Sequence, residues 1–234
     1  MREWEEFIPE QERKIYEKAG YKGKDQFGRN PALLIIDVIT GFTGTKPLDV
    51  MDAIDEFPTS CGKVAWDALP KIEQLLGACR DADVPVIYST SDPDFKAAFG
   101  NATKRGVDAT DFEKLATQFP EMIKPQEREF IVRKARASAF RHALDHLSGA
   151  QEYRLLIGYR YEHLRLRARH GPGRLFLWLS GFLGRGVCLR PLAYLAPGQS
   201  FEMNAKYATV IQLAEALNYV QQLKRLEGRK AIAG

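Results

Sequence analysis

The chain has 234 residues and a formal net charge of +4, and 45% of its residues are hydrophobic. These values are typical of one globular domain with a sizeable core. Three Cys residues argue against a disulfide framework, the charged start MREWEEFIPEQERK argues against a signal peptide, and the longest apolar run, Leu175–Leu183, is far shorter than the ~20 residues that span a bilayer. We therefore expect a soluble, cytoplasmic protein with no membrane partner.

Helical and strand-like patterns alternate from the N-terminus onward. Residues 2–19 have apolar positions at helical spacing and stop at Gly20, which predicts a helix. The continuous apolar run Pro31–Ile36, followed by Asp37, predicts a strand buried on both faces, as in a parallel sheet. The pattern then predicts a helix over 62–81, a strand over 84–90, a long excursion over 91–127 with a short helix near 111–117, a strand over 129–134 and a helix around 140–147.

The same alternation continues to the C-terminus. Strands are expected at 154–157 and 207–211, and an amphipathic helix at 212–226. Strands that alternate with helices predict an α/β fold with a doubly wound, mainly parallel sheet flanked by helices. We expect an N-terminal helical extension over 1–30, a single domain over 31–226 and a tail over 227–234.

Two charged residues stand at the ends of predicted strands. Asp37 follows the run Ala-Leu-Leu-Ile-Ile, and Lys134 follows Phe-Ile-Val-Arg. Because ligands bind outside the carboxyl ends of such strands, the two side chains can face each other there and stabilise one another's charged forms. A purely structural ion pair is the alternative, since strand ends commonly carry charges.

Three stretches around these residues, IIDVITGF, VPVIYST and VRKARASAF, resemble the isochorismatase-like cysteine hydrolases. The N-terminal helix and the stretch GRNPALLIIDVITGFTG are most similar to the N-carbamoylsarcosine amidohydrolase branch. The resemblance covers residues 5–157 and resumes at 201–210. Asp37 falls on the catalytic Asp of the family, and Lys134, followed by the pattern x3-S-A-F, falls on the catalytic Lys.

The resemblance implies hydrolysis of a small carbamoyl or amide substrate, similar to N-carbamoylsarcosine, with release of ammonia. It implies a Cys nucleophile at the N-terminus of the helix after the fourth strand, where thiolate is favoured and backbone N–H groups can hold an oxyanion. Asp37 would be the general base and acid, and Lys134 would lower the thiol pKa. It further implies no cofactor and a homo-oligomer, expected to be a tetramer. We expect no metal, because residues 89–94 lack the Asp-x-His pattern of some relatives in the nicotinamidase branch.

The expected nucleophile is missing from the chain as written. Its position reads Glu162-His-Leu-Arg-Leu-Arg167, without Cys. A frame built from the last two bases of each codon and the first base of the next can instead spell Ile-Gly-Thr-Ser-Thr-Ser-Gly-Cys-Val-Arg-Ala-Thr from Tyr159, and its Cys spans the codons of Leu166 and Arg167. We hypothesise that two compensating one-base shifts, near 157–160 and 200–203, put the segment between them out of frame.

The same segment explains the basic charge. Residues 159–200 hold seven Arg, no Lys and one acid, and without them the formal net charge falls from +4 to −2. An Arg-rich stretch can bind nucleic acid or an anionic membrane, but this one lacks the regular face that either partner requires. We therefore expect no nucleic-acid partner.

Other thiols and imidazoles have simpler interpretations. Cys188 lies about 54 residues after Lys134, and we do not favour it as a substitute for the nucleophile. Cys61, just before a predicted helix, is either a low-pKa thiol or, as we favour, a structural loop residue, while Cys79 lies on an apolar helix face and is expected in the core. The four His residues form no convincing metal set: His142, His146, His163 and His170.

A second interpretation is a catalytically inactive protein of the same fold. If the chain is made as written, it lacks the nucleophile, and Arg/Leu/Gly/Pro-rich sequence replaces the fifth strand and its flanking helices. Arg165, Arg167 and Arg169 would then fall where the buried start of a helix is expected, which would disfavour folding.

Overall fold

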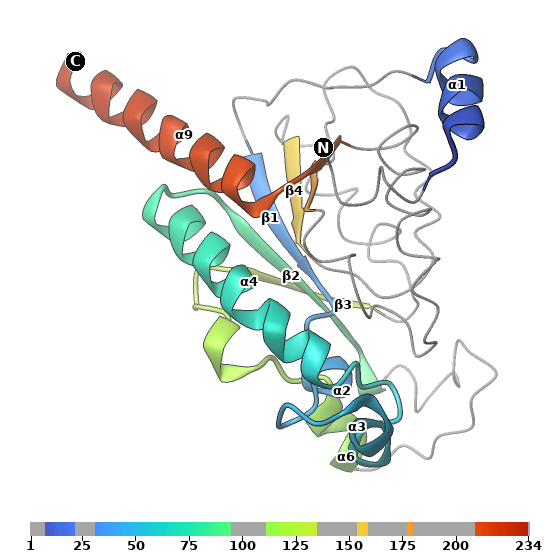
Figure 1. Ribbon diagram of the computed structural model, residues 1–234. Coiled ribbons are helices and arrows are strands. Elements are labelled where there is room, and N and C mark those ends of the chain that lie inside the picture. The colour runs from blue at the N-terminus through green and yellow to red at the C-terminus, as the bar shows by residue number, and fades with distance from the viewer. Residues whose placement is uncertain are drawn as a thin grey trace.

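The strands form one parallel sheet in the computed structural model, which describes residues 8–21, 31–94, 111–134, 154–158, 177–179 and 209–233. The order is β3-β2-β1-β4-β5-β6 (Figure 1). The chain runs outward from β1 to β3 and then crosses to β4 on the other side of β1, so the sheet is doubly wound, as predicted. The strands are β1 (Pro31–Ile36), β2 (Val86–Ser91), β3 (Phe130–Lys134), β4 (Arg154–Gly158), β5 (Leu177–Leu179) and β6 (Thr209–Ile211).

Two long helices, α4 (Lys63–Asp81) and α9 (Leu213–Ala233), lie side by side on one face of the sheet (Figure 1). Alternate residues of β1, Leu33 and Ile35, point into the core that these helices cover. The other described helices are α1 (Glu10–Lys18), α2 (Thr40–Thr43), α3 (Val50–Glu56), α6 (Asp111–Ala116) and the 3₁₀ turn η2 (Glu121–Ile123).

The central strand β1 is buried along its whole length. Leu33 and Ile35 face α4, while Leu34 and Ile36, on the opposite face, are no more than 3% exposed. This confirms the prediction of a strand covered on both faces, which is why its sequence is a continuous apolar run rather than an alternating one.

Several element boundaries differ from the prediction. Helix α1 begins at Glu10, because Pro9 has an extended ψ of 140°. Strand β2 begins two residues later than expected, and α9 continues to Ala233, beyond the predicted end at Leu226. The short elements α2, α3 and η2 were not predicted from periodicity, because each is too short to show it. The predicted helix around 140–147 lies outside the described residues.

The chain as written supplies a fifth strand, which corrects one expectation. Strand β5 lies between β4 and β6 and pairs in parallel with both. Its residues belong to the apolar run Leu175–Leu183, and such a run suits an inner strand of a parallel sheet. The Arg/Leu/Gly/Pro-rich sequence over residues 159–200 therefore still provides a strand at this place in the sheet.

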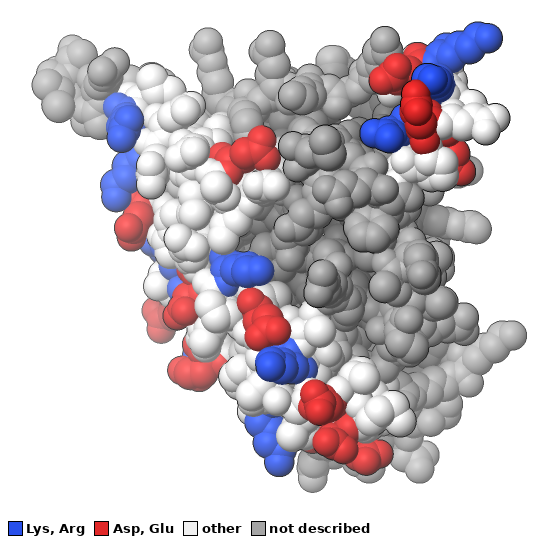
Figure 2. Space-filling model, viewed as in Figure 1, with Lys and Arg blue, Asp and Glu red and all other residues white. Residues whose placement is uncertain are grey.

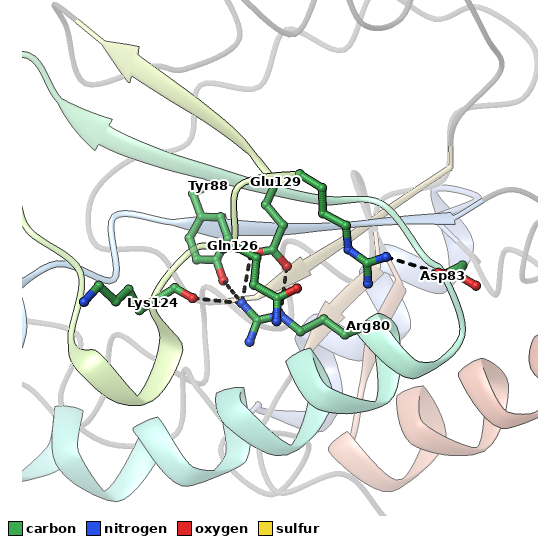
Figure 3. A network of polar contacts seen from close by, with 7 residues as sticks. Arg80, Asp83, Tyr88, Lys124, Gln126 and Glu129 are labelled. Atoms are coloured by element: carbon green, nitrogen blue, oxygen red, sulfur yellow. Dashed lines mark hydrogen bonds and ion pairs between the residues drawn. The ribbon is translucent and has the colours of Figure 1, made fainter.

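A network of polar contacts connects helix α4 to the amino-terminal end of the sheet (Figure 3). The Arg80 guanidinium donates two hydrogen bonds to the Glu129 carboxylate, at 2.8 and 2.9 Å, and one to the Tyr88 hydroxyl at 3.3 Å. It also donates to the Lys124 carbonyl, and the Gln126 amide donates to Glu129 at 2.7 Å. Bidentate Arg–carboxylate geometry of this kind fixes both partners.

Burial opposes ionisation of Glu129, whose side chain is 3% exposed, but the hydrogen bonds from Arg80 and the Gln126 amide outweigh it and lower the pKa. A lowered carboxyl pKa contributes stability above the unfolded-state value, about 4.3, and this contribution is lost as the pH falls through the folded-state value. Glu129→Gln is therefore expected to lower the free energy of unfolding at pH 7 by about 1.5–3 kcal/mol. Urea unfolding at pH 7 and pH 3 should show the difference from wild type shrinking at the lower pH.

The matched control is Glu127→Gln, two residues away and exposed. It is expected to change the free energy of unfolding by no more than about 0.5 kcal/mol. A Glu129→Gln effect of equal size at both pH values would contradict the assignment of this stability to the ionised carboxylate.

Candidate functional site

Asp37 leaves strand β1 in a left-handed conformation, with φ of 54°. Side chains alternate along a strand, so an extended Asp37 would continue the pattern and point with Ile35 toward α4. The left-handed turn breaks this alternation and takes the carboxylate to Ser89 and Lys134, on the other face. Asp is among the few non-glycine residues that adopt this conformation, and such strain collects at functional sites.

Two side chains, one from β2 and one from β3, hold the Asp37 carboxylate. Its Oδ1 accepts a hydrogen bond from the Ser89 hydroxyl of β2 at 3.0 Å, and its Oδ2 forms an ion pair with Lys134 Nζ at the end of β3. The Asp37 amide donates to the Ser89 carbonyl at 3.1 Å. Both charged side chains are 7% exposed, so the pair brings two opposite charges together in a buried place.

The structure thus brings together the two residues that the sequence placed at strand ends. It adds Ser89, which sequence reasoning did not assign to the site. The available signal was that Ser89 is the first of three polar residues at the carboxyl end of β2, whose sequence is VIYSTS. This signal identifies Ser89 only when the register between β1 and β2 is known. In that register Ser89 lies opposite Ile36, the residue immediately before Asp37.

This arrangement has the chemical capacity for proton transfer. An ionised carboxylate has about four lone-pair positions, and among the residues that the structure describes Ser89 and Lys134 occupy two of them. The remaining positions can accept a proton from a third group, and the Lys134 ammonium can stabilise negative charge that develops nearby.

The turn after Asp37 is packed against the segment before β3. The Thr40 amide and hydroxyl both donate to the Gln118 carbonyl, at 2.8 and 3.2 Å. Gly41 lies so close to Ala116 that an added Cβ would be 3.0 Å from its carbonyl oxygen. A side chain at position 41 would therefore push the two segments apart, so the glycine permits the contact that supports the turn.

The described cysteines are both buried. Cys79 is fully buried in the core of α4, which confirms its predicted place, and burial raises its pKa to about 12. Cys61 is 4% exposed and its amide donates to the Phe42 carbonyl at 2.8 Å, which favours the structural interpretation. Leu166, Cys188 and the four His residues lie outside the described residues.

The Cys79 thiol is expected to resist alkylation in the folded protein. With a pKa of about 12, only about one thiol in 10⁴ is ionised at pH 8, and the thiolate is the reactive form. Iodoacetamide labelling at pH 8, read by peptide mass spectrometry, should leave Cys79 unmodified until urea is added. Equal labelling with and without urea would contradict this assignment.

On the face shown in Figure 2, the described basic and acidic side chains are interleaved rather than gathered by sign. Within the described ranges, no group of three or more His, Cys, Asp or Glu side chains is placed to hold a metal ion. None of the helices described has the length and hydropathy needed to cross a membrane.

A buried carboxylate–ammonium pair at the carboxyl ends of a doubly wound parallel sheet defines the class: an α/β protein with a candidate acid–base site. The sequence model of the isochorismatase domain matches residues 31–153, which include Asp37, Ser89 and Lys134. The chain therefore belongs to the isochorismatase family of hydrolases. No curated protein sequence matches the chain.

Solved structures share the fold at low sequence identity. A cysteine hydrolase from Pseudomonas syringae pv. phaseolicola is 16% identical, with a TM-score of 0.64 over 86% of this chain and 97% of its own. An isochorismatase-like hydrolase from Alkaliphilus metalliredigens is 17% identical, with a TM-score of 0.55 over 82% and 98%. N-carbamoylsarcosine amidase from Thermoplasma acidophilum is 15% identical, with a TM-score of 0.50 over 79% and 96%.

Proposed function

We propose that Asp37 and Lys134 form the acid–base part of a cysteine amidohydrolase site. Its substrate would be a small carbamoyl or amide compound similar to N-carbamoylsarcosine, hydrolysed at a C–N bond without a cofactor. The observation that carries the proposal is the buried Asp37–Lys134 ion pair at the carboxyl ends of β1 and β3, in a chain of the isochorismatase family. The fold likeness to N-carbamoylsarcosine amidase from Thermoplasma acidophilum supports the substrate class.

The pair would carry two proton transfers. Asp37 takes the proton of a cysteine thiol as the sulfur forms a bond to the carbonyl carbon, and it returns that proton to the nitrogen as the C–N bond breaks and ammonia leaves. Water, deprotonated by Asp37, then cleaves the thioester-like intermediate and restores the thiol. Lys134 stabilises the thiolate and holds the Asp37 carboxylate in place.

The thiol in this scheme is the cysteine that spans the codons of Leu166 and Arg167 in the shifted frame. The match to the family ends at residue 153, shortly before the anomalous segment begins at Tyr159. This supports the proposal that residues 159–200 are out of frame. The second candidate is a catalytically inactive member of the family, favoured by the absence of Cys from 162–167 in the chain as written.

An intact mass measured on protein expressed from the native gene, combined with an ammonia-release assay, tests the proposal. We expect the mass of the shifted-frame product and ammonia release that iodoacetamide abolishes. A mass of 26.5 kDa that matches the written chain, with no thiol-dependent ammonia release, would establish the inactive alternative.

A further inference from the structure

We propose that Ser89 is a positioning residue that holds the Asp37 carboxylate for proton transfer, an inference that rests on the function proposed above. Ser89 contacts Asp37 twice. Its hydroxyl donates to Asp37 Oδ1 at 3.0 Å, and its carbonyl accepts from the Asp37 amide at 3.1 Å. The first contact fixes the side chain and the second fixes the backbone.

This double contact explains how Asp37 keeps its left-handed φ of 54°. A non-glycine residue in that region costs of order 1–3 kcal/mol and persists only where the surroundings hold it. The parallel register places Ser89 between Ile36 of β1 and Val132 of β3, so the serine stands between the strands that carry Asp37 and Lys134. The place of Ser89 in the sheet and its two contacts with Asp37 therefore both support a positioning role.

Ser89 acts through Asp37 rather than on a substrate. The residue is 0% exposed, so its hydroxyl is not available to attack a carbonyl carbon. Without the hydroxyl, Oδ1 loses the donor that directs it, and the carboxylate is free to rotate about its Cβ–Cγ bond against Lys134. A carboxylate that is misplaced by a fraction of an ångström transfers protons more slowly, while substrate binding is unaffected.

The first test needs no activity and uses the written chain. Ser89→Ala is expected to move the ¹³C resonance of the Asp37 carboxyl carbon, whereas Ser89→Thr, which keeps a hydroxyl, leaves it close to wild type. Ser60→Ala is the matched control, because Ser60 is also 0% exposed and its hydroxyl accepts from the Gly62 amide in the loop before α4. An Asp37 resonance that is the same in Ser89→Ala and wild type would overturn the proposal.

The second test measures ammonia release by a chain with residues 159–200 rewritten in the shifted frame. Ser89→Ala is expected to lower kcat about 10- to 100-fold with KM within twofold, Ser89→Thr to recover most of kcat, and Ser60→Ala to stay within twofold of the parent. A Ser89→Ala kcat equal to the parent's would overturn the positioning role. A parent without activity would instead count against the proposed function, and the resonance test would still decide the role of Ser89.

Discussion

A chain with residues 159–200 rewritten in the shifted frame is expected to release ammonia from N-carbamoylsarcosine or a related ureido acid. We expect a rate at least about 1,000-fold above that of the written chain, because the rewriting restores a nucleophile beside Asp37 and Lys134. The measurement is coupled-enzyme detection of ammonia over a panel of carbamoyl and amide acids.

Two controls separate nucleophilic catalysis from improved folding. Replacing the restored cysteine with alanine should return the rate to that of the written chain while circular dichroism stays unchanged. Asp37→Asn in the rewritten chain should also lower kcat, because the amide cannot take the thiol proton, and its rate is compared only where circular dichroism shows that this destabilised variant is folded. A rewritten chain that is folded and inactive over the panel, or active without its cysteine, would contradict the proposed chemistry.

Breaking the Asp37–Lys134 ion pair is expected to cost about 3–5 kcal/mol of unfolding free energy, because either single variant removes the opposite charge from the other, buried member of the pair. Lys134→Met keeps the length of the side chain but removes the ammonium, so that Ser89 is the partner that the carboxylate keeps among the described residues. Asp37→Asn keeps a residue that tolerates the left-handed φ but leaves the ammonium beside a neutral amide.

The double variant, Asp37→Asn with Lys134→Met, tests the coupling directly. It removes both charges, so it should be less destabilised than the sum of the single variants by at least about 2 kcal/mol. Urea unfolding of the wild type, the two single variants and the double variant completes the double-mutant cycle. Additive losses would show that the two charges do not depend on each other for their burial.

The main architecture follows from local patterns in the chain. A continuous apolar run predicted β1 with the Asp37 that follows it, because a strand buried on both faces does not alternate between apolar and polar residues. The edge strand β3 was predicted from the shorter stretch Phe-Ile-Val-Arg, which ends in Lys134. Helix α4 was predicted from apolar residues at helical spacing, and the structure buries seven residues along this helix. These elements carry the candidate pair, so its two members could be identified before their contact was seen.

Features that depend on tertiary contact could not be predicted in the same way. Helix α2 spans four residues and is held by Gln118, which lies far along the chain. The role of Ser89 depends on a register between β1 and β2, and the left-handed φ of Asp37 depends on that same contact. Periodicity along one strand carries no information about its neighbour's register or about a single turned residue.

The central claim is that the buried Asp37–Lys134 pair belongs to a cysteine-hydrolase site whose nucleophile is displaced out of frame. The nucleotide sequence of codons 157–203 tests it most directly. The claim predicts that the shifted frame is open throughout and reads a Cys codon across Leu166 and Arg167. A stop codon in that frame, or any other residue at that junction, would contradict it.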